Sequence, residues 1–250
     1  MQIELTLKGK NTPGLSVPIH YNTMIQGFIY HNIQSQLAEF LHNQGFTYEK
    51  RVFKLFTFSK LQGKYILDQQ RGRILFNEPP HLLITTVFEA LSSGLINGFL
   101  LGERFQLGNQ PVEVLDVKVC ETPLPKGPCV VVTKSPIAVY STEDKPDGRS
   151  FTHFFKPGDS NYNHLITNNL IKKHQAFYGV PMEGEVKVKP LNRMVMRKVF
   201  YKNTPTQAYE GRLLLSGTPE LLRMGLAAGL GSRNSQGLGC IQMEKECDTK

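Results

Sequence analysis

The first half of the chain alternates short stretches of strand-forming residues with two longer stretches of helical spacing. Alternating apolar and polar residues, or a short run of branched and aromatic residues, is typical of a strand, whereas apolar residues spaced by three and four are typical of a helix. These patterns give the order β-α-β-β-α-β with an inserted hairpin. Strands are predicted at residues 2–8, 52–58, 74–76, 81–86, 104–107 and 112–119, helices at 24–41 and 87–100, and the hairpin at 63–73.

The second half of the chain repeats this order after a segment of three prolines and one glycine at residues 121–128. Such a segment breaks regular structure, so it is predicted to link two domains, 1–120 and 129–250. Strands are predicted at residues 130–133, 137–140, 185–189, 194–201 and 209–216 and after residue 239, helices at 163–177 and 219–228, and a polar excursion at 142–149.

The repeated order β-α-β-β-α-β is the ferredoxin-like arrangement. The predicted fold class is therefore α+β, with tandem ferredoxin-like (RRM-like) domains. No strong sequence repeat accompanies the repeated order, so the duplication is one of architecture.

The composition of the chain favours a polyanionic partner. The chain has 250 residues, 40% of them hydrophobic, which is enough to form a core in each domain. Its net charge is +8, of which +6 lies in residues 129–250. A strongly basic half favours nucleic acid, although solubility alone is the competing explanation.

Cysteine and histidine spacing favours neither a metal nor a cofactor. The four cysteines form no C-x-x-C pair, and the seven histidines show no metal-site spacing. Buried, reduced thiols in a cytoplasmic protein are expected. The N-terminus has no signal-peptide core and no apolar run is long enough to cross a bilayer, so no membrane association is expected.

A basic run in the second half is the first candidate RNA-binding surface. Residues 187–202 contain no acid, and Phe200 and Tyr201 lie among the bases. Cations neutralise phosphates and aromatic rings stack on bases, so this run favours RNA binding; a solvated strand face with core aromatics is the alternative. The bases are Lys187, Lys189, Arg193, Arg197, Lys198 and Lys202.

A glycine-rich stretch near the C-terminus is the second candidate. Residues 229–239, G-L-G-S-R-N-S-Q-G-L-G, place two Gly-Leu-Gly triplets around a polar segment. Glycine allows backbone conformations and close approaches that other residues do not, so the stretch predicts a tight loop with exposed N–H groups for phosphate oxygens. A turn joining a helix to a strand is the alternative. The candidate RNA-binding residues are Gly229, Gly231, Arg233, Gly237 and Gly239.

This glycine loop resembles that of the RAMP superfamily of CRISPR-associated proteins, and most closely the endoribonucleases that cut CRISPR precursor RNA within its repeats, the Cas6 family. The resemblance extends over the whole chain through Q-G-F-I-Y, K-L-F-T-F-S and S-P-I-A-V. It implies tandem ferredoxin-like domains and CRISPR repeat RNA as the partner. Contact with effector-complex subunits and a monomeric or homodimeric state are further expectations.

The resemblance also implies three catalytic residues, Tyr30, His42 and Lys54. RNA can be cut without a metal when its own 2′-hydroxyl attacks phosphorus, which needs a base, an acid and a cation. Each residue has a plain alternative: a tyrosine at the core rim, a solvated histidine at a helix end and a solvated lysine. In one straight helix His42 would lie near His31, so the chain must turn after Leu41. His31 and His20 are the competing histidines.

The expected function is therefore metal-independent endoribonuclease activity that leaves a 2′,3′-cyclic phosphate and a 5′-hydroxyl. The first alternative is a non-catalytic RNA-binding RAMP subunit of a CRISPR effector complex. An unrelated two-domain RNA-binding protein is the second. The sequence leaves open the repeat sequence and whether the repeat RNA forms a hairpin.

Overall fold

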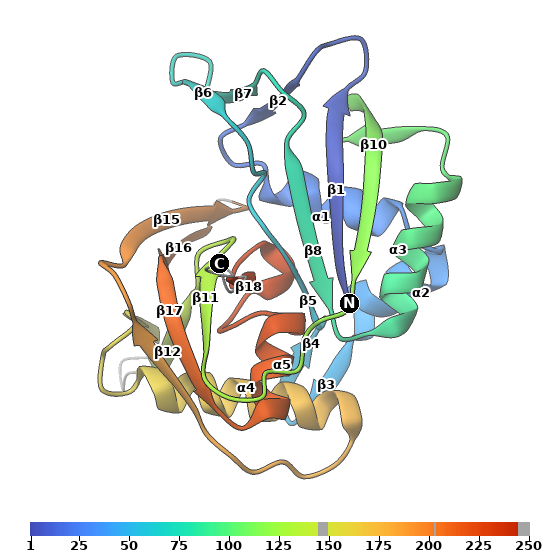
Figure 1. The fold of residues 1–250 in the computed structure, drawn as a ribbon. Coiled ribbons are helices and arrows are strands. Elements are labelled where there is room, and N and C mark those ends of the chain that lie inside the picture. The colour runs from blue at the N-terminus through green and yellow to red at the C-terminus, as the bar shows by residue number, and fades with distance from the viewer. Residues whose placement is uncertain (145–149, 203, 245–250) are drawn as a thin grey trace, which may run out of the picture.

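Two antiparallel sheets form the framework of the protein (Figure 1). The computed structural model describes residues 1–144, 150–202 and 204–244. The N-terminal sheet has the strand order β5-β8-β1-β10-β9, and the C-terminal sheet has the order β14-β17-β11-β18. The strands of the first are β1 (Gln2–Gly9), β5 (Phe56–Phe58), β8 (His81–Thr86), β9 (Phe105–Leu107) and β10 (Gln110–Cys120), and those of the second are β11 (Cys129–Thr133), β14 (Val186–Pro190), β17 (Arg212–Gly217) and β18 (Ile241–Met243).

Both sheets have ferredoxin-like topology. Without the short β9, each sheet orders its strands as second, third, first and fourth along the chain. Helices connect the first strand to the second and the third to the fourth, as the β-α-β-β-α-β order requires. The predicted tandem ferredoxin-like fold is confirmed. These helices are α1 (Asn22–His31) and α3 (Glu89–Leu101) in the N-terminal half, and α4 (Tyr162–Tyr178) and α5 (Pro219–Ala228) in the C-terminal half.

Alternation along β1 builds the N-terminal core. Ile3, Leu5 and Leu7 are fully buried, and Ile3 lies opposite Ile84 of β8. Removing such side chains from water stabilises the fold by about 1.5–3 kcal/mol each. The C-terminal core is separate, and α5 contacts its own strands β17 and β18 as well as β5 and β8 of the other sheet. The α5 helix therefore lies where the two halves meet.

Hairpins project from both halves. The predicted strand at 209–216 is two strands separated at Gly211, and a strand at Ser150–Phe155 was not predicted. Of the predicted polar excursion, residues 142–144 belong to a strand, so that prediction was wrong there; residues 145–149 lie outside the described part of the chain. The additional strands are β2 (Leu15–Pro18), β3 (Phe46–Tyr48), β4 (Arg51–Phe53), β6 (Tyr65–Asp68), β7 (Arg73–Phe76), β12 (Val139–Asp144), β13 (Ser150–Phe155), β15 (Val195–Tyr201) and β16 (Thr204–Glu210).

The predicted single helix at 24–41 was wrong. Helix α1 ends at His31, α2 (Ser35–Glu39) follows, and a π-helix η1 (Phe40–Gln44) completes the segment. The Asn32 side chain donates a hydrogen bond of 2.7 Å to the Phe28 carbonyl, and Gln34 is extended. Asparagine competes with the helix for backbone hydrogen bonds in this way, which ends the helix despite its continuing apolar period.

The predicted strand at 52–58 was also wrong as one element, because it breaks at Lys54 and Leu55. Leu55 adopts a positive φ of 55°, and its buried side chain packs in the C-terminal core. The hairpin of β3 and β4 lies against α4, where Lys172 pairs with Glu49 at 2.8 Å. The proposed domain limits of 1–120, 121–128 and 129–250 stay a prediction, and the contact of this hairpin with α4 joins the two predicted domains.

The cysteine prediction is correct in part. Cys129 and Cys240 are buried thiols, whereas Cys120 is exposed at the end of β10, so the prediction was wrong for it. Cys247 lies outside the described residues. Among the described helices, none has the length and apolar character needed to cross a membrane.

Candidate functional site

The three candidate catalytic residues lie together, although Tyr30 comes from α1, His42 from η1 and Lys54 from the break between β4 and β5. The rings of Tyr30 and His42 meet edge to face with their centroids 6.4 Å apart. Lys54 Nζ donates a hydrogen bond of 3.0 Å to the His42 carbonyl. The turn that brings them together lies at residues 32–34, before α2, and not after Leu41 as the sequence suggested.

Tyr30 lies in the last turn of α1 and packs edge-on against Phe56, with the centroids 6.0 Å apart. Burial raises the pKa of the Tyr30 phenol to about 12, and the nearby Tyr201 hydroxyl adds to the shift. The phenol therefore keeps its proton at neutral pH. It can donate a hydrogen bond there but is a poor proton acceptor.

His42 is exposed on the π-helix. The wide turn is closed by the Gly45 amide, which donates to the Phe40 carbonyl at 2.8 Å while Gly45 adopts a φ of 68°. His42 Nδ1 lies 2.8 Å from the side-chain oxygen of Asn43, which can only accept; this contact favours the tautomer with the hydrogen on Nδ1 and leaves Nε2 for a substrate. Single π-turns of this kind are frequent at functional sites.

Lys54 lies at the strand break that interrupts residues 52–58, and burial lowers the pKa of its ammonium. The competing histidines lie elsewhere: His31 is exposed at the end of α1, and His20 packs on Phe200 with the ring centroids 4.8 Å apart. Within the described part of the chain, no hydrogen bond or ring contact joins the side chain of either histidine to Tyr30 or Lys54. His42 is therefore the histidine of the cluster.

A cleft of about 430 Å³ lies beside this cluster, between residues 51–56 and 231–236. Its cations are Arg51, Lys54, Lys173 and Arg233, and of the described residues that line it none is Asp or Glu. A concave, low-dielectric wall with one sign of charge concentrates the field and attracts anions. The cleft is therefore suited to a phosphate backbone.

The glycine loop forms one wall of the cleft, and its four glycines and Arg233 all have φ between 59° and 83°. The glycines are buried, and a Cβ on Gly231 would collide with the Ala138 carbonyl oxygen. The two ends of the loop are thus held by their own amides, which are not exposed there as the sequence had suggested. The Leu230 amide donates to the Gly239 carbonyl at 2.9 Å, the Ser232 amide to the Ala138 carbonyl at 2.8 Å, and the Gly239 amide to the Pro136 carbonyl at 2.8 Å.

The middle of the loop differs from its two ends. The amides of Arg233, Asn234 and Ser235 have no acceptor among the described residues, and all three residues line the cleft. The Arg233 guanidinium donates to Thr206 Oγ1 at 2.8 Å and lies 5.6 Å from the centre of the Tyr140 ring. No carboxylate of the described chain pairs with it, so its charge is left for an anion.

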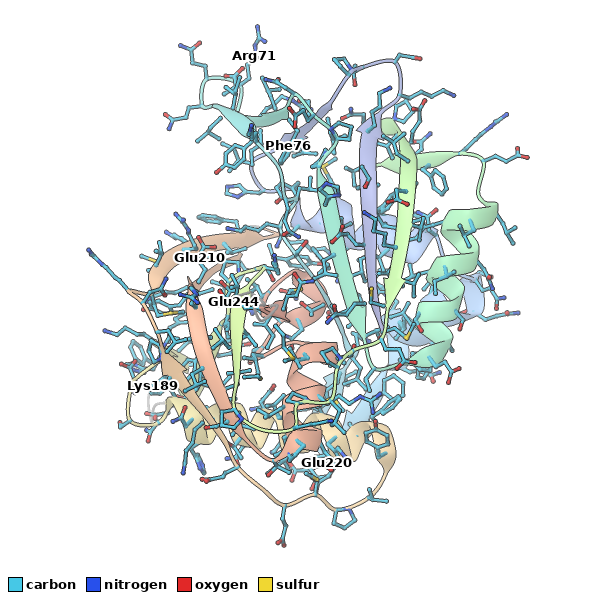
Figure 2. All side chains as sticks on the ribbon, viewed as in Figure 1. Arg71, Phe76, Lys189, Glu210, Glu220 and Glu244 are labelled. Atoms are coloured by element: carbon cyan, nitrogen blue, oxygen red, sulfur yellow. The ribbon has the colours of Figure 1, made fainter. Side chains whose placement is uncertain are left out.

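The basic run of residues 187–202 is only partly free to bind RNA. Lys187 and Lys189 point outward from the edge strand β14, and Lys189 is visible at the outer side of the C-terminal half (Figure 2). Lys187 pairs with Glu185 at 2.9 Å. Arg193 is exposed, and Lys198 lies 5.3 Å from the centre of the Phe200 ring.

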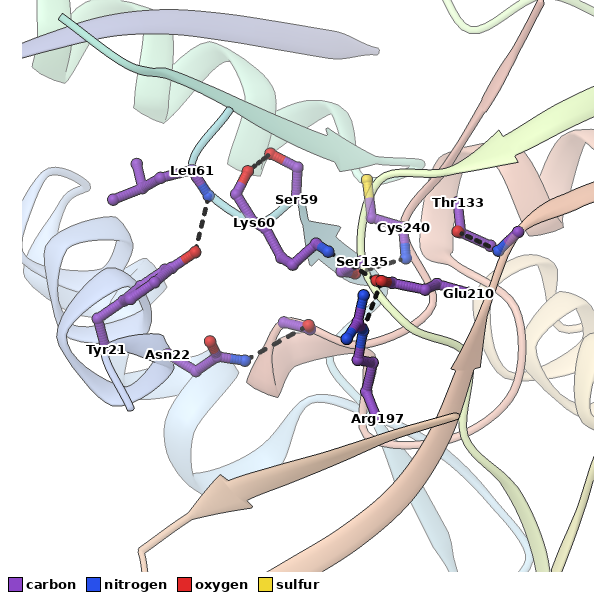
Figure 3. Close-up of polar contacts among 12 residues, drawn as sticks. Tyr21, Asn22, Ser59, Lys60, Leu61, Thr133, Ser135, Arg197, Glu210 and Cys240 are labelled. Atoms are coloured by element: carbon purple, nitrogen blue, oxygen red, sulfur yellow. Dashed lines mark hydrogen bonds and ion pairs between the residues drawn. The ribbon is translucent and has the colours of Figure 1, made fainter. Parts of the chain in front are cut away.

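Glu210 supplies an acid that the sequence run did not contain. Its carboxylate pairs with Arg197 and with Lys60 of the N-terminal half, each at 2.6 Å (Figure 3). Burial works to raise the pKa of Glu210, but the hydrogen bonds from Lys60 and Arg197 outweigh it and lower that pKa. Arg197 is therefore partly neutralised, and the pair also connects the two halves.

Helix α1 is hydrogen-bonded to the glycine loop. Asn22 donates to the Gln236 carbonyl at 2.8 Å (Figure 3), and Gln26 donates to the Ser235 carbonyl at 2.7 Å. Tyr201, at the end of β15, donates its hydroxyl hydrogen to Gln26. The loop and the helix that carries Tyr30 thus keep a fixed spacing.

Two residues of the site were not singled out from the sequence, Asn169 and Lys173 of α4, which line the cleft. A signal for Lys173 existed, because it follows Ile166 by seven residues and Leu170 by three, which places a lysine on the buried face of the helix. No group of three or more His, Cys, Asp or Glu side chains in the described part of the chain is placed to hold a metal ion.

Two family models match the chain. Residues 16–118 match the N-terminal model of CRISPR-associated protein Cas6, and residues 120–243 match the C-terminal model. The chain is 28% identical to the CRISPR-associated endoribonuclease Cas6 1 of Methanocaldococcus jannaschii, over 96% of this chain and 92% of that protein. It is 27% identical to the CRISPR-associated endoribonuclease Cas6 of Pyrococcus furiosus, over 94% and 86% of the two chains.

Solved structures agree with these matches. A structure described as CRISPR associated protein Cas6 superposes with a TM-score of 0.78 at 25% identity, over 98% of this chain and 99% of that one. A Cas6-related protein of Pyrococcus furiosus superposes with a TM-score of 0.83 at 18% identity, over the same shares, which supports the fold alone. The two family models together span nearly the whole chain, and the protein therefore belongs to the Cas6 family of CRISPR-associated proteins.

Proposed function

We propose that this protein is an endoribonuclease that cleaves CRISPR precursor RNA within its repeats. The observation that carries the proposal is the meeting of Tyr30, His42 and Lys54 beside a cleft lined by cations. Two relatives that match nearly the whole chain bear the name CRISPR-associated endoribonuclease Cas6. A non-catalytic RNA-binding subunit has no need of this acid–base cluster.

The reaction we propose is attack of a ribose 2′-oxygen on the adjacent phosphorus. The new O2′–P bond forms while the P–O5′ bond breaks, so the products are a 2′,3′-cyclic phosphate and a 5′-hydroxyl. One proton leaves the 2′-hydroxyl and another reaches the departing O5′. Positioned side chains that transfer such protons contribute about 10²–10⁴-fold each.

The geometry suggests a role for each side chain in this reaction. His42 is assigned to proton transfer, because its Nε2 is not used within the described part of the protein. Lys54 is assigned to the negative charge that develops on the phosphate oxygens, in keeping with its place on the cleft wall. Tyr30 is assigned a hydrogen bond to the reacting group, since its raised pKa keeps the phenol protonated.

Cleavage of repeat RNA in excess EDTA is the experiment that tests the proposal. We expect cleavage at the same rate with and without the chelator, because the attacking oxygen belongs to the substrate. The 5′ fragment should resist labelling at its 3′ end until the cyclic phosphate is removed, and the 3′ fragment should accept a phosphate on its 5′-hydroxyl at once. Binding without cleavage would indicate the non-catalytic subunit, and loss of cleavage in EDTA would overturn the metal-independent route.

Arg233 is proposed to hold an RNA phosphate, because it lines the cleft and its guanidinium has no carboxylate partner in the described chain. Arg233→Ala should weaken binding across RNA sequences and reduce the slope of log affinity against log salt by about 1, the effect of losing one phosphate contact. Equilibrium binding at several salt concentrations measures both quantities.

Arg71→Ala is the matched control for Arg233→Ala. It removes the same charge from an exposed turn between β6 and β7, at the top of the molecule and away from the cleft (Figure 2). This control should leave affinity and salt slope close to those of the wild type. An Arg233→Ala protein that behaved like the control would reduce the glycine loop to a structural turn.

A further inference from the structure

Lys173 is a buried lysine whose three hydrogen bonds all go to the glycine loop. It lies on α4 with 2% of its surface exposed. Its Nζ donates to the Gly229 carbonyl at 2.7 Å, to the Gly231 carbonyl at 3.2 Å and to the Asn234 side-chain oxygen at 2.7 Å. An ammonium has three hydrogens, so no donor is left for a ligand.

Asn234 extends this arrangement to the other end of the loop. Its side-chain nitrogen donates to the carbonyls of Leu230 and Leu238, each at 3.0 Å. Lys173 and Asn234 together therefore satisfy carbonyls in both Gly-Leu-Gly triplets. With these carbonyls turned inward, Arg233 and the amides of residues 233–235 lie on the cleft side of the loop.

The charge of Lys173 is not balanced within the described part of the protein. No carboxylate pairs with it, and the other charged residues that line the cleft are Arg51, Lys54 and Arg233, all cations. Burial lowers the pKa of the Lys173 ammonium to about 7. Burying an amino group without a carboxylate partner costs stability, so the presence of Lys173 is better explained by the loop conformation that it holds than by packing.

We propose that Lys173 is a positioning residue for RNA: through Asn234 it fixes both Gly-Leu-Gly triplets in the conformation that presents Arg233 and the central loop amides to RNA phosphates. This role rests on the proposed function, because it takes RNA as the ligand of the cleft. Lys173 itself does not touch the RNA. A lysine that only supports the core would affect stability without a specific effect on RNA affinity.

Lys173→Met tests this role, with Lys172→Met as the matched control. Lys172 is the preceding residue on α4, its replacement by methionine also removes one amino group, and within the described part of the chain it pairs with the exposed Glu49 at 2.8 Å. Lys173→Met should weaken repeat-RNA binding about tenfold or more, since the loop loses the three hydrogen bonds that hold it in the conformation proposed to bind phosphates. Its single-turnover cleavage rate at saturating protein should stay within about threefold of the wild type, because Tyr30, His42 and Lys54 are unchanged. Lys172→Met should change neither quantity.

Hydrogen exchange provides a readout that does not need RNA. The amides of Leu230, Ser232 and Gly239 donate within the protein and should exchange faster in Lys173→Met than in the control. Unchanged exchange, or a folded variant with wild-type RNA affinity, would overturn the proposal. A wild-type protein that does not bind repeat RNA would instead overturn the proposed function.

A second variant covers the case in which Lys173→Met does not fold, as judged by circular dichroism. Asn234→Ala keeps the lysine but removes the side-chain oxygen that accepts from it. The substitution also removes the two hydrogen bonds that the Asn234 side chain donates to the carbonyls of Leu230 and Leu238. It should also weaken RNA binding and speed exchange of the loop amides. Wild-type affinity in a folded Asn234→Ala protein would overturn the proposal by itself.

Discussion

Replacing His42 with alanine should lower the single-turnover rate of repeat-RNA cleavage by about 10²–10⁴-fold, the usual contribution of a positioned proton-transfer group. Affinity for repeat RNA should change by less than about threefold, because the imidazole is exposed at the margin of the cluster and is not one of the cations that line the cleft. Tyr30 cannot take over as the base, since burial holds the pKa of its phenol at about 12.

His31→Ala is the control for His42→Ala. His31 is also an exposed histidine and ends α1, but within the described part of the chain no hydrogen bond or ring contact joins its side chain to Tyr30, His42 or Lys54. We expect His31→Ala to cleave at close to the wild-type rate. If His42→Ala cleaves normally while His31→Ala or His20→Ala does not, the assignment of the histidine is wrong and the π-helix has no direct part in the chemistry.

The strand and helix order could be predicted from sequence because its signals are local. Ile3, Leu5 and Leu7 alternate with polar residues, and the sheet buries all three. Both β-α-β-β-α-β orders depend on such patterns, so the tandem ferredoxin-like fold followed from them. The missed strand at Ser150–Phe155 lacked this support: among the described strands it pairs with β12 alone, and most of its side chains are exposed.

The site geometry could not be predicted in the same way. The apolar period of residues 24–41 continues through the break, which depends on one side-chain hydrogen bond, that of Asn32 to Phe28. The break decides whether His42 meets Tyr30 or His31. Residues 52–58 read as one continuous strand, but the strand partner changes at Lys54: β4 pairs with β3, whereas β5 pairs with β8.

Contacts between residues far apart in the sequence are the other feature of the site that could not be predicted. Lys173 binds residues 56, 58 and 61 positions away, so its role cannot be derived from neighbouring residues. The same holds for Arg197: its own run of residues 187–202 contains no acid, and its partner Glu210 lies on the neighbouring strand β16. A lysine on the apolar face of a helix is the sequence signal that would have singled out Lys173.

The largest loss of cleavage should come from a change in the RNA substrate and not from a change in the protein. A 2′-deoxy substitution at the nucleotide immediately 5′ of the cut should abolish cleavage, because the proposed nucleophile is the 2′-oxygen of that ribose. Binding should be nearly unchanged, since the cleft presents cations and amides for phosphates, which the substitution leaves intact. Gel separation of the products and equilibrium binding of the same RNA measure the two quantities.

A second substrate isolates the position of the missing hydroxyl. The same 2′-deoxy substitution one nucleotide further from the cut removes one hydroxyl as well, but not the nucleophile, and should be cleaved at close to the normal rate. Cleavage of the first substrate would require water as the nucleophile and would leave a 3′-phosphate or a 5′-phosphate in place of the cyclic product. In that case the cluster of Tyr30, His42 and Lys54 would have to activate water, and the roles assigned from the geometry would be wrong.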